Sequence, residues 1–388
     1  MKIAIIGIRG LPSSYSGLET IISELAPRFV QRGHEVTVYC RSPLFKERLP
    51  SYKGVQLRYL PSIEHKWFST LSHTFLAAID ASIHRYHILF AMNVGNASFG
   101  IFPKLMGLPC VLNVDGIEWL RPKWNRLAKK VFYWSAKYAK YFWDILVTDA
   151  AEMQRIYREE FGANSVYIGY GANIEYSTNP EVVRQYGLEP GNYFLIASRL
   201  VPDNNADLIV EGFVKSGVDK ILAIAGGANY KGNLVERKFH EKLKALANHK
   251  VKFLGHISDQ LHVKELHCNC YAYVHGHQFG GINPALLKAL AYGNCILALD
   301  TPFSREVLKD GEYGILYKKD PNDLASKLQQ IVKDPELAQK FRDKARNRVL
   351  ERFTWDRIAD EYLLLFDMLH QRKPKEEIFQ KFQSLRVP

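Results

Sequence analysis

The stretch that decides the fold is HGHQFGGINPALLKALAYGNCILALDTPFSREV, residues 275–307. It continues an apolar run at 270–274 and crosses Gly280 and Gly281 into a segment whose apolar residues have helical spacing. This order predicts a strand, a glycine turn and the start of a helix. The first turn of such a helix has unpaired N–H groups and the positive end of the helix dipole, and glycines let a phosphate approach the backbone. The stretch therefore predicts either a diphosphate site or a tight turn without a ligand.

A second junction of the same kind opens the chain. Residues 3–6 form a buried-type strand, and a turn through Gly7 and Gly10 leads to Gly17 and a helical pattern. Pro27 lies inside that pattern, where we expect it to kink the helix or remove a hydrogen bond. Two such junctions need two sheets.

The size and composition of the chain agree with two domains. Its 388 residues suffice for two cores, and 47% hydrophobic with 24% charged residues is typical of a globular protein. The net charge of +12 predicts an acidic partner, which nucleic acid, anionic lipid or a phosphorylated small molecule would provide. Charge alone does not choose among them.

The cysteines and the apolar runs bear on the compartment. The five cysteines are scattered, and CNC at 268–270 lacks the spacing of a metal site, so we expect reduced thiols. The apolar run in MKIAIIGIRG is too short for a signal peptide, and no stretch approaches the roughly 20 apolar residues that span a bilayer. We therefore expect a cytoplasmic protein that can still contact a membrane surface.

Apolar runs alternate with longer helical segments along most of the chain. This alternation predicts parallel sheets with helices on both faces, and ligands that bind beyond the carboxyl ends of the strands. Gly10, Asp115 and Asp149 fall at such ends. Further strands are predicted at 35–39, 55–60, 88–92, 109–114 and 145–148, and in a second series at 193–197, 221–225, 251–254, 270–274 and 296–299.

A loop-rich stretch from 170 to 191 separates the two series. The predicted fold class is therefore α/β, with two Rossmann-like doubly wound parallel-sheet domains at 1–172 and 173–352. The segment 353–388 is predicted to hold a helix that returns to the first domain and a basic, polar tail that we expect to be partly mobile.

Several blocks of the chain resemble a known family. They are IIGIRGLPSSYSGLETIISEL, NVDGIEWLRPKW, YGAN, SRLVPDNNADLIVEGF, VKFLGHI, and HGHQFGGINPALLKAL followed by REVL. In this order they are similar to family 4 of the retaining glycosyltransferases, which have the GT-B fold of two facing Rossmann-like domains. The similarity is greater to a subgroup that includes bacterial rhamnosyltransferases of cell-wall and capsule synthesis, and it covers nearly the whole chain.

The resemblance implies a reaction. A sugar would move from a nucleotide diphosphate donor, held by the second domain, to an acceptor at the first domain, with retention at the anomeric carbon. Because a diphosphate departs from an oxocarbenium-like transition state, the enzyme must stabilise negative charge. The subgroup favours dTDP-L-rhamnose as donor. No cofactor is implied, and the chain lacks the Asp-x-Asp motif of metal-dependent transferases, so we expect no metal.

By the same resemblance, the donor lies at strand ends of the second domain. Arg199 would hold the diphosphate with its fork of donors and assist its departure, unless it forms only a surface ion pair. Asn204 stands where related enzymes carry a lysine, so Arg199 and the glycine loops would meet the phosphate charge. The N–H groups of Gly280, Gly281 and Asn283 would hold the distal phosphate and the sugar.

Three further side chains belong to this predicted donor site. His277 would approach the sugar or phosphate, or else act as a cap without a ligand. Glu306 matches a family glutamate, although a carboxylate at a helix N-terminus gives the same pattern. Lys288 departs from the family, in which a glutamate holds the ribose. A deoxyribose nucleotide, or a phosphate contact by Lys288, would make that glutamate dispensable.

Loops of the first domain would complete the sites. Gly10 and Gly17 would let the donor approach, and Glu19 would either contact it or serve as a charge at the helix start. We interpret Asp115 as the base or positioner of the acceptor hydroxyl, with Glu118 in support; a plain Asp-Gly turn is the alternative.

Asp149 is a second acceptor-side candidate. It follows the predicted strand at 145–148, as Asp115 follows the strand at 109–114. Asp149 is therefore a candidate of the same kind as Asp115, whose place on the acceptor side is what the resemblance implies.

The segment 121–143 interleaves basic and aromatic residues at helical spacing. Such a helix suits the surface of an anionic membrane, as a lipid-linked saccharide acceptor would require. The alternative is a helix that packs one face on the sheet and solvates the other.

Other functions remain open at this stage. Lys288 favours a catalytically silent relative that binds sugar nucleotides, and a sugar-nucleotide epimerase would share the architecture. A nucleic-acid-binding function has the charge in its favour but no recognisable reading helix or RNA module, so we expect no nucleic-acid partner.

Overall fold

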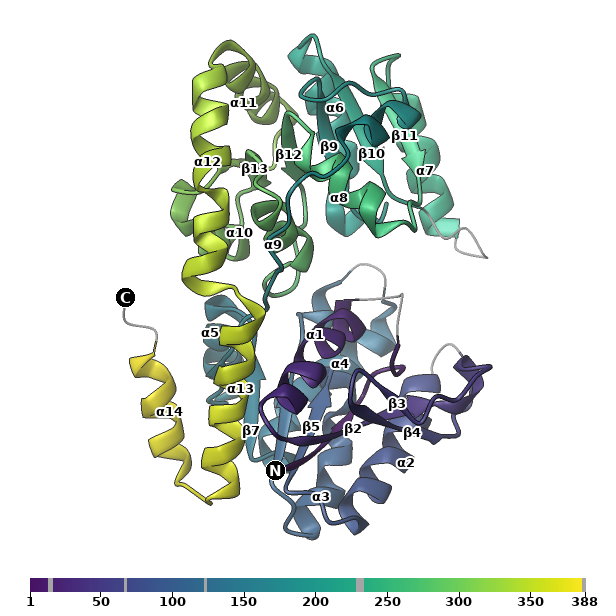
Figure 1. Ribbon diagram of the computed structural model, residues 1–388, viewed down its shortest axis with the longest axis vertical. Helices are drawn as coiled ribbons and strands as arrows, with labels where there is room; N and C mark the ends of the chain where they lie inside the picture. Colours follow the sequence, from purple (N-terminus) through teal and green to yellow (C-terminus); the bar gives the residue numbers. More distant parts are fainter. Residues whose placement is uncertain (13–16, 66–67, 122–123, 228–233, 386–388) are drawn as a thin grey trace. The chain divides into compact units, whose positions relative to one another are not determined.

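The computed structural model describes residues 1–388 except 13–16, 66–67, 122–123, 228–233 and 386–388 (Figure 1). The chain divides into two compact units. Unit 1 consists of Met1–Gly171 and Trp355–Pro388, and unit 2 of Ala172–Thr354. These bounds lie one residue before the expected division at 172 and two residues after the expected division at 352.

The described part of unit 1 has a sheet of eight strands in the order β3-β4-β2-β1-β5-β6-β7-β8. Neighbouring strands are parallel except β3 and β4. The order reverses between β1 and β5, and ligands of such sheets bind at that switch point. The sequence pattern does not predict β3 and β8, because two residues are too few to show a period. The strands are β1 (Lys2–Ile6), β2 (Glu35–Arg41), β3 (Ser51–Tyr52), β4 (Val55–Leu60), β5 (Ile88–Met92), β6 (Cys110–Asn113), β7 (Ile145–Thr148) and β8 (Val166–Tyr167).

Helices and short 3-10 turns join these strands. Pro27 is buried within the first helix, which continues to Gln31. The elements are α1 (Gly17–Gln31), η1 (Ser42–Leu44), α2 (Ser69–Ile83), η2 (Val94–Gly100), α3 (Ile101–Leu105), η3 (Glu118–Leu120), α4 (Arg126–Phe142), α5 (Ala151–Phe161), α13 (Trp355–His370) and α14 (Lys375–Ser384).

The C-terminal segment belongs to unit 1. The ring of Phe366 in α13 lies 5.8 Å from that of Phe29 in α1, and Arg32, which directly follows α1, reaches Asp360 at 2.5 Å. In the tail that the sequence predicts to be partly mobile, residues 375–384 form α14 and bury Ile378 and Phe382. Two apolar side chains four residues apart suffice to dock one face of a helix, and the surrounding charges mask this pattern in the sequence.

Unit 2 holds a second parallel sheet, with the order β11-β10-β9-β12-β13-β14 in its described residues. Its switch point lies between β9 and β12. The strands are β9 (Tyr193–Ala197), β10 (Ile221–Ala225), β11 (Val251–Gly255), β12 (Ala272–His275), β13 (Ile296–Leu299) and β14 (Ile315–Tyr317). The helices and turns are η4 (Pro180–Tyr186), η5 (Pro202–Asn204), α6 (Ala206–Ser216), α7 (Leu234–Leu246), α8 (Gln260–Cys268), α9 (Pro284–Ala291), α10 (Pro302–Leu308), η6 (Lys309–Gly311), α11 (Pro321–Lys333) and α12 (Pro335–Arg352).

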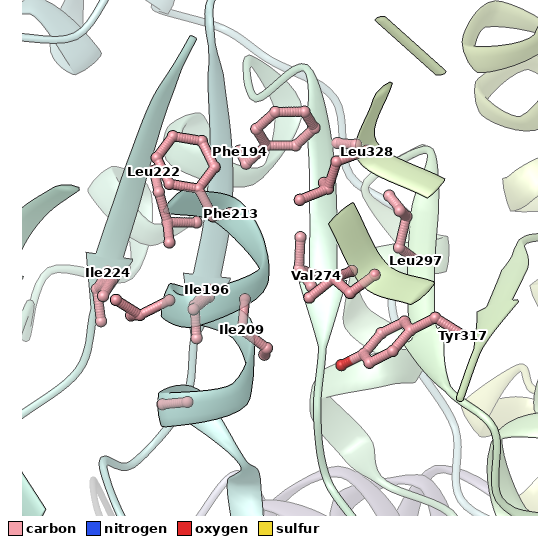
Figure 2. Packing of buried hydrophobic residues seen from close by; sticks show 14 of the residues in the cluster. Phe194, Ile196, Ile209, Phe213, Leu222, Ile224, Val274, Leu297, Tyr317 and Leu328 are labelled. Atoms are coloured by element: carbon pink, nitrogen blue, oxygen red, sulfur yellow. The ribbon is translucent and has the colours of Figure 1, made fainter. Parts of the chain in front are cut away.

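The core of unit 2 explains why its strands are continuous apolar runs. Figure 2 shows Ile196 of β9 and Val274 of β12 among the buried side chains that pack with Ile209 and Phe213 of α6. All residues of β12 and β13 are buried, so neither strand has a solvent face that would call for polar residues. The predicted fold class, two parallel-sheet α/β domains, is confirmed.

Candidate functional site

The carboxyl ends of β9 and β12 in unit 2 carry the predicted donor residues. Arg199 follows β9 by two residues and is exposed. Its guanidinium has no hydrogen bond or ion pair with any residue that the structure describes. The surface ion pair considered above is therefore not formed, and five N–H donors remain for an anion.

Asn204 and His277 form one polar unit beside Arg199. The Asn204 side-chain amide donates to the Arg199 carbonyl at 2.7 Å, and its oxygen lies 2.7 Å from His277 Nδ1. Since that oxygen can only accept, Nδ1 carries a hydrogen, and the neutral ring has its lone pair on Nε2. Asn204 therefore orients the imidazole ring of His277.

Two loops of unit 2 are tied together at this edge. A Cβ added to Gly276 would collide with the Asn204 carbonyl. Asn205 has φ +48° and donates to the Gly276 carbonyl at 2.8 Å, and Gln278 N–H donates to the Asp203 carbonyl at 3.1 Å. Sequence reasoning missed Asn205 and Gly276, although an Asn-Asn pair and a glycine directly after a strand are signals of such a contact.

The glycine loop ends at the start of α9. Gly280 has φ +121°, a conformation that side chains disfavour, and a Cβ there would lie 3.4 Å from His277 Nε2. Asn283 caps α9, because its side chain accepts from Ala285 N–H at 2.8 Å. The Asn283 side chain is thus used within the helix start, which leaves the backbone of this loop for an anion.

Lys288 is half-buried in α9 and has no hydrogen bond or ion pair with the residues that the structure describes. It lies near the buried His267. Burial lowers the pKa of His267 to about 4; a hydrogen bond to Asn294 opposes this shift and the Lys288 charge adds to it. The site therefore holds a positive charge where the family pattern has a carboxylate.

Glu306 is half-buried in α10, near the end of that helix. The alternative of an N-terminal helix charge is wrong, since the first turn of α10 contains no acidic residue. Arg348 of α12 donates to the backbone carbonyl of Glu306 at 3.0 Å. The helix that carries Glu306 is thereby anchored to α12.

In unit 1, Glu19 anchors the first glycine loop. Its carboxylate is buried in the first turn of α1 and accepts from Arg9 N–H at 2.9 Å. Gly10 has φ +131°, and a Cβ there would lie 2.6 Å from Cys40 Sγ, so only glycine fits. Gly17 opens α1, and a Cβ there would meet no described atom within 4 Å. Gly10 is therefore required by the close packing against Cys40, and Glu19 holds the first glycine loop through its bond to Arg9 N–H.

Asp115 lies two residues beyond β6 with φ +59° and is half-buried. The left-handed residue of the Asp-Gly pair is therefore the aspartate, and Gly116 is not among the positive-φ glycines. A left-handed conformation costs a non-glycine residue about 1–3 kcal/mol. Asp115 N–H donates to Asn113 Oδ1 at 2.9 Å, which helps to hold this conformation.

Glu118 and Asp149 occupy different surroundings. Glu118 is buried and accepts from Arg121 and from the Trp124 indole, each at 2.6 Å, so it organises the segment after β6. Asp149 is buried directly after β7. Glu118 is thus hydrogen-bonded within its own segment of the chain, whereas Asp149 lies at the carboxyl end of β7.

Two tyrosines join the aspartates, and sequence reasoning missed them. Burial, and then the nearby carboxylates of Asp115 and Asp149, raise the pKa of Tyr157 and Tyr170 well above its usual value. Asp115 and Asp149, which follow β6 and β7, are therefore close enough to both buried tyrosines to act on them electrostatically. Tyr157 stands in none of the sequence blocks quoted above, and Tyr170 is the first residue of YGAN, but neither sequence context indicates a role, so only their packing identifies them.

The predicted membrane segment includes α4, while residues 122–123 lie outside the described part of the chain. The buried face of α4 consists of alanines, and its other face exposes apolar and aromatic side chains. Lys137 lies 5.0 Å from the Trp134 ring centroid, which stacks on Tyr138 at 5.5 Å. The exposed apolar and aromatic residues of α4 are Leu127 (71%), Val131 (51%), Tyr133 (37%), Trp134 (47%), Tyr138 (43%) and Tyr141 (56%).

Comparison with known proteins identifies the class. Residues 15–175 match the family model Glycosyltransferase Family 4, and residues 179–348 match Glycosyl transferases group 1. Together with the two parallel sheets, these matches define a glycosyltransferase with the GT-B fold. The chain is thus a GT-B glycosyltransferase, with a Family 4 domain in unit 1 and a group 1 domain in unit 2.

Individual relatives are distant. An uncharacterized glycosyltransferase of Methanocaldococcus jannaschii is 28% identical over 41% of this chain and 42% of its own length. A phosphatidyl-myo-inositol mannosyltransferase of Mycolicibacterium smegmatis is 23% identical over 90% of both chains. The Methanocaldococcus protein and two further relatives are matched over less than half of their lengths.

Solved structures agree on the fold. Sucrose-phosphate synthase from Thermosynechococcus elongatus has a TM-score of 0.81 at 17% identity, covering 96% of this chain and 100% of that chain. Anabaena HepE, solved with UDP-glucose, has a TM-score of 0.76 at 15% identity over 95% and 99%. The rhamnosyltransferase subgroup stays a prediction. None of the described helices is long and apolar enough to cross a membrane.

Proposed function

We propose that the protein is a retaining glycosyltransferase that moves a sugar from a nucleoside diphosphate to an acceptor hydroxyl. The observation that carries the proposal is Arg199, whose exposed guanidinium has no described partner at the switch point of unit 2. The Asn204–His277 pair and the glycine loop before α9 lie at the same strand edge. A diphosphate there would meet a fixed charge, an oriented imidazole and backbone N–H groups.

The chemistry requires stabilisation of a leaving group. The bond between the anomeric carbon and the diphosphate oxygen breaks, and negative charge gathers on the diphosphate. Arg199 would bind two of its oxygens in parallel. On the acceptor side, the carboxylate of Asp115 would take the hydroxyl proton. No step uses a metal, so EDTA should leave the transfer rate unchanged.

We propose dTDP-L-rhamnose as the donor, supported by the resemblance of the sequence blocks and by Lys288. Ligand that binds only the native state raises the free energy of unfolding, by about 2.7 kcal/mol at a concentration of 100 times Kd. Melting temperatures of wild type and Lys288→Glu should therefore be measured with dTDP, UDP and GDP. Stabilisation of wild type by dTDP alone supports the proposal, whereas stabilisation by UDP or GDP alone contradicts the donor.

Lys288 also favours a second candidate function, a silent sugar-nucleotide-binding relative. That candidate predicts that a nucleotide stabilises wild type but that wild type transfers no sugar. Incubation of wild type with dTDP-L-rhamnose or UDP-glucose and a membrane extract separates the two functions. The proposed transferase gives a glycosylated product, whose anomeric configuration by NMR must equal that of the donor. A product of opposite configuration would contradict retention.

We further propose that the acceptor is lipid-linked and that α4 contacts an anionic membrane. Six exposed apolar or aromatic side chains and neighbouring lysines on one helix suit a lipid surface better than water. Co-sedimentation with phosphatidylglycerol vesicles should exceed that with phosphatidylcholine vesicles. Val131→Ser should weaken it about threefold or more, since it removes apolar area. Leu350→Ser, at an equally exposed apolar residue of α12, is the matched control; an equal loss there would contradict the assignment to α4.

A further inference from the structure

We propose that Asn113 is the positioning residue of the acceptor side, because its buried side-chain amide accepts from the N–H of the strained Asp115. Its backbone carbonyl accepts from the N–H of the strained Asn93. The inference rests on the proposed function, in which Asp115 accepts the hydroxyl proton. It assigns to Asn113 the task of fixing where that carboxylate stands.

Asn113 is the last residue of β6 and is 0% exposed. Its backbone carbonyl accepts from Asn93 N–H at 2.9 Å, and its side-chain oxygen accepts from Asp115 N–H at 2.9 Å. Its side-chain nitrogen donates to the Tyr362 hydroxyl at 2.8 Å. Two of these bonds use the oxygen and the nitrogen of the side-chain amide, and the third uses the backbone carbonyl. Together they connect the ends of β5 and β6 with α13.

The two residues that Asn113 holds share an uncommon conformation. Asn93 has φ +75° and ψ +124°, and Asp115 has φ +59°. Such conformations persist where the surroundings over-determine them, and they concentrate at functional sites. Asn93 follows β5 at the switch point of unit 1, and Asp115 follows the neighbouring strand. Without the Asn113 side chain, the Asp115 backbone would lose a bond that opposes its relaxation, whereas Asn93 N–H would keep its bond to the backbone carbonyl of residue 113.

Tyr362 sets the direction of the amide. It is fully buried in α13, and its ring lies 4.9 Å from that of Phe90 in β5. Because the tyrosine receives the amide N–H, the amide oxygen must point toward Asp115 N–H. The C-terminal helix thereby supports a residue 249 positions earlier in the chain.

The experiment compares Asn113→Ala, Asn113→Asp and Tyr362→Phe with wild type, using the donor and acceptor that support transfer. We expect Asn113→Ala to lower kcat about 100-fold, since a misplacement of about 1 Å has that effect. Thermal stabilisation by the donor nucleotide, which unit 2 binds, should stay unchanged and shows that the variant is folded. Tyr362→Phe should lower kcat about fivefold.

Asn113→Asp supplies a readout that a merely structural role would not move. Its carboxylate can accept from both Asp115 N–H and the Tyr362 hydroxyl, so it should restore kcat to within about tenfold of wild type. The added negative charge should raise the pKa of Asp115 and shift the acid limb of the rate profile to higher pH. Tyr39→Phe, which removes another buried hydroxyl of unit 1 that donates to Asp80 at 2.7 Å, is the matched control.

The inference is overturned if folded Asn113→Ala transfers sugar at the wild-type rate, if Asn113→Asp leaves the pH profile in place, or if Tyr39→Phe lowers kcat as much as Tyr362→Phe. Each of these results leaves the proposed function intact, because wild type is active in all of them. A wild type that binds a nucleotide but transfers no sugar overturns the proposed function and this inference together.

Discussion

The strand edges of the two units differ in chemistry although their sheets are built alike. At the switch point of unit 2 the side chains are a cation, an imidazole and amides, and the backbone makes room through Gly276 and Gly280. The corresponding edge of unit 1 carries Asp115 and Asp149, with buried tyrosines beside them. The edge of unit 2 has the side chains to bind an anion, and the edge of unit 1 has carboxylates that can accept a proton. The sheet supplies the place, and the loop residues supply the chemistry.

The two edges also hold their loops by different means. Unit 2 uses glycines and a loop-to-loop contact, in which Asn205 bonds the Gly276 carbonyl at 2.8 Å. Unit 1 places the non-glycine residues Asn93 and Asp115 at positive φ. The N–H groups of both residues donate to Asn113, that of Asn93 to its backbone carbonyl and that of Asp115 to its side-chain oxygen. Unit 2 also places one non-glycine residue at positive φ, since Asn205 has φ +48°, so the two edges differ in the contacts that hold their loops.

Asp115→Asn tests the proton-accepting edge and has the largest expected effect. Asparagine tolerates the left-handed conformation, so the fold should be kept while the base is removed. We expect the transfer rate to fall about 1000-fold, within the range that general bases contribute. Steady-state kinetics and nucleotide-induced thermal shifts measure both effects. Activity within tenfold of wild type would remove the chemical contrast between the edges.

Glu265 of α8 tests how the stability of unit 2 depends on acid pH. Burial alone would raise the pKa of this carboxyl, but hydrogen bonds from Ser177, Thr178 and Asn179 outweigh it and lower the pKa to about 2. The folded state thus binds fewer protons than the unfolded chain. The resulting stability is complete above about pH 4.5 and is lost as the pH falls toward 2.

Glu265→Gln should therefore lower the free energy of unfolding of unit 2 by about 3 kcal/mol at pH 7 and flatten its dependence on acid pH. Denaturant titrations from pH 7 to pH 3 measure this change. Glu181→Gln, at a side chain that is 68% exposed and paired with Arg184, is the control and should change little. Equal losses in both variants would show that the buried bonds of Glu265 do not set the pH response.

Arg199→Ala tests the anion-binding edge. Charge-assisted bonds to a phosphate contribute about 2 kcal/mol, so nucleotide Kd should rise about 30-fold. Arg184→Ala removes an equally charged, exposed side chain of unit 2 and should leave Kd unchanged. Calorimetric titration with the best nucleotide measures both constants. If the two variants bind alike, the difference between the edges does not lie in Arg199.

Asp115→Gly has the smallest expected effect on stability and addresses the strain itself. Glycine adopts the left-handed conformation at little cost, so the melting temperature should rise by an amount that corresponds to about 1 kcal/mol. Transfer should be lost as in Asp115→Asn. A lower melting temperature would mean that contacts of the aspartate outweigh the strain.

Much of the fold could be predicted because both sheets are parallel and buried. Runs such as 3–6 and 193–197 are apolar throughout, and their alternation with helical segments indicates the architecture. The short strands β3, β8 and β14 escape such a reading, and so does α14, whose two buried residues lie among charges. Such short or mostly polar elements are identified only by their pairing or packing with other elements in the tertiary structure.

The sequence by itself determined where the polar edges lie, since Arg199, His277, Asp115 and Asp149 all follow apolar strands. Local chemistry suffices for this, because a strand end is a feature of neighbouring residues. Only the tertiary structure decided what those side chains do. Asn204 orients His277 across 73 positions, and Tyr362 supports Asn113 across 249. Hydrogen bonds between residues so far apart depend on packing of the whole unit, and no local pattern encodes them.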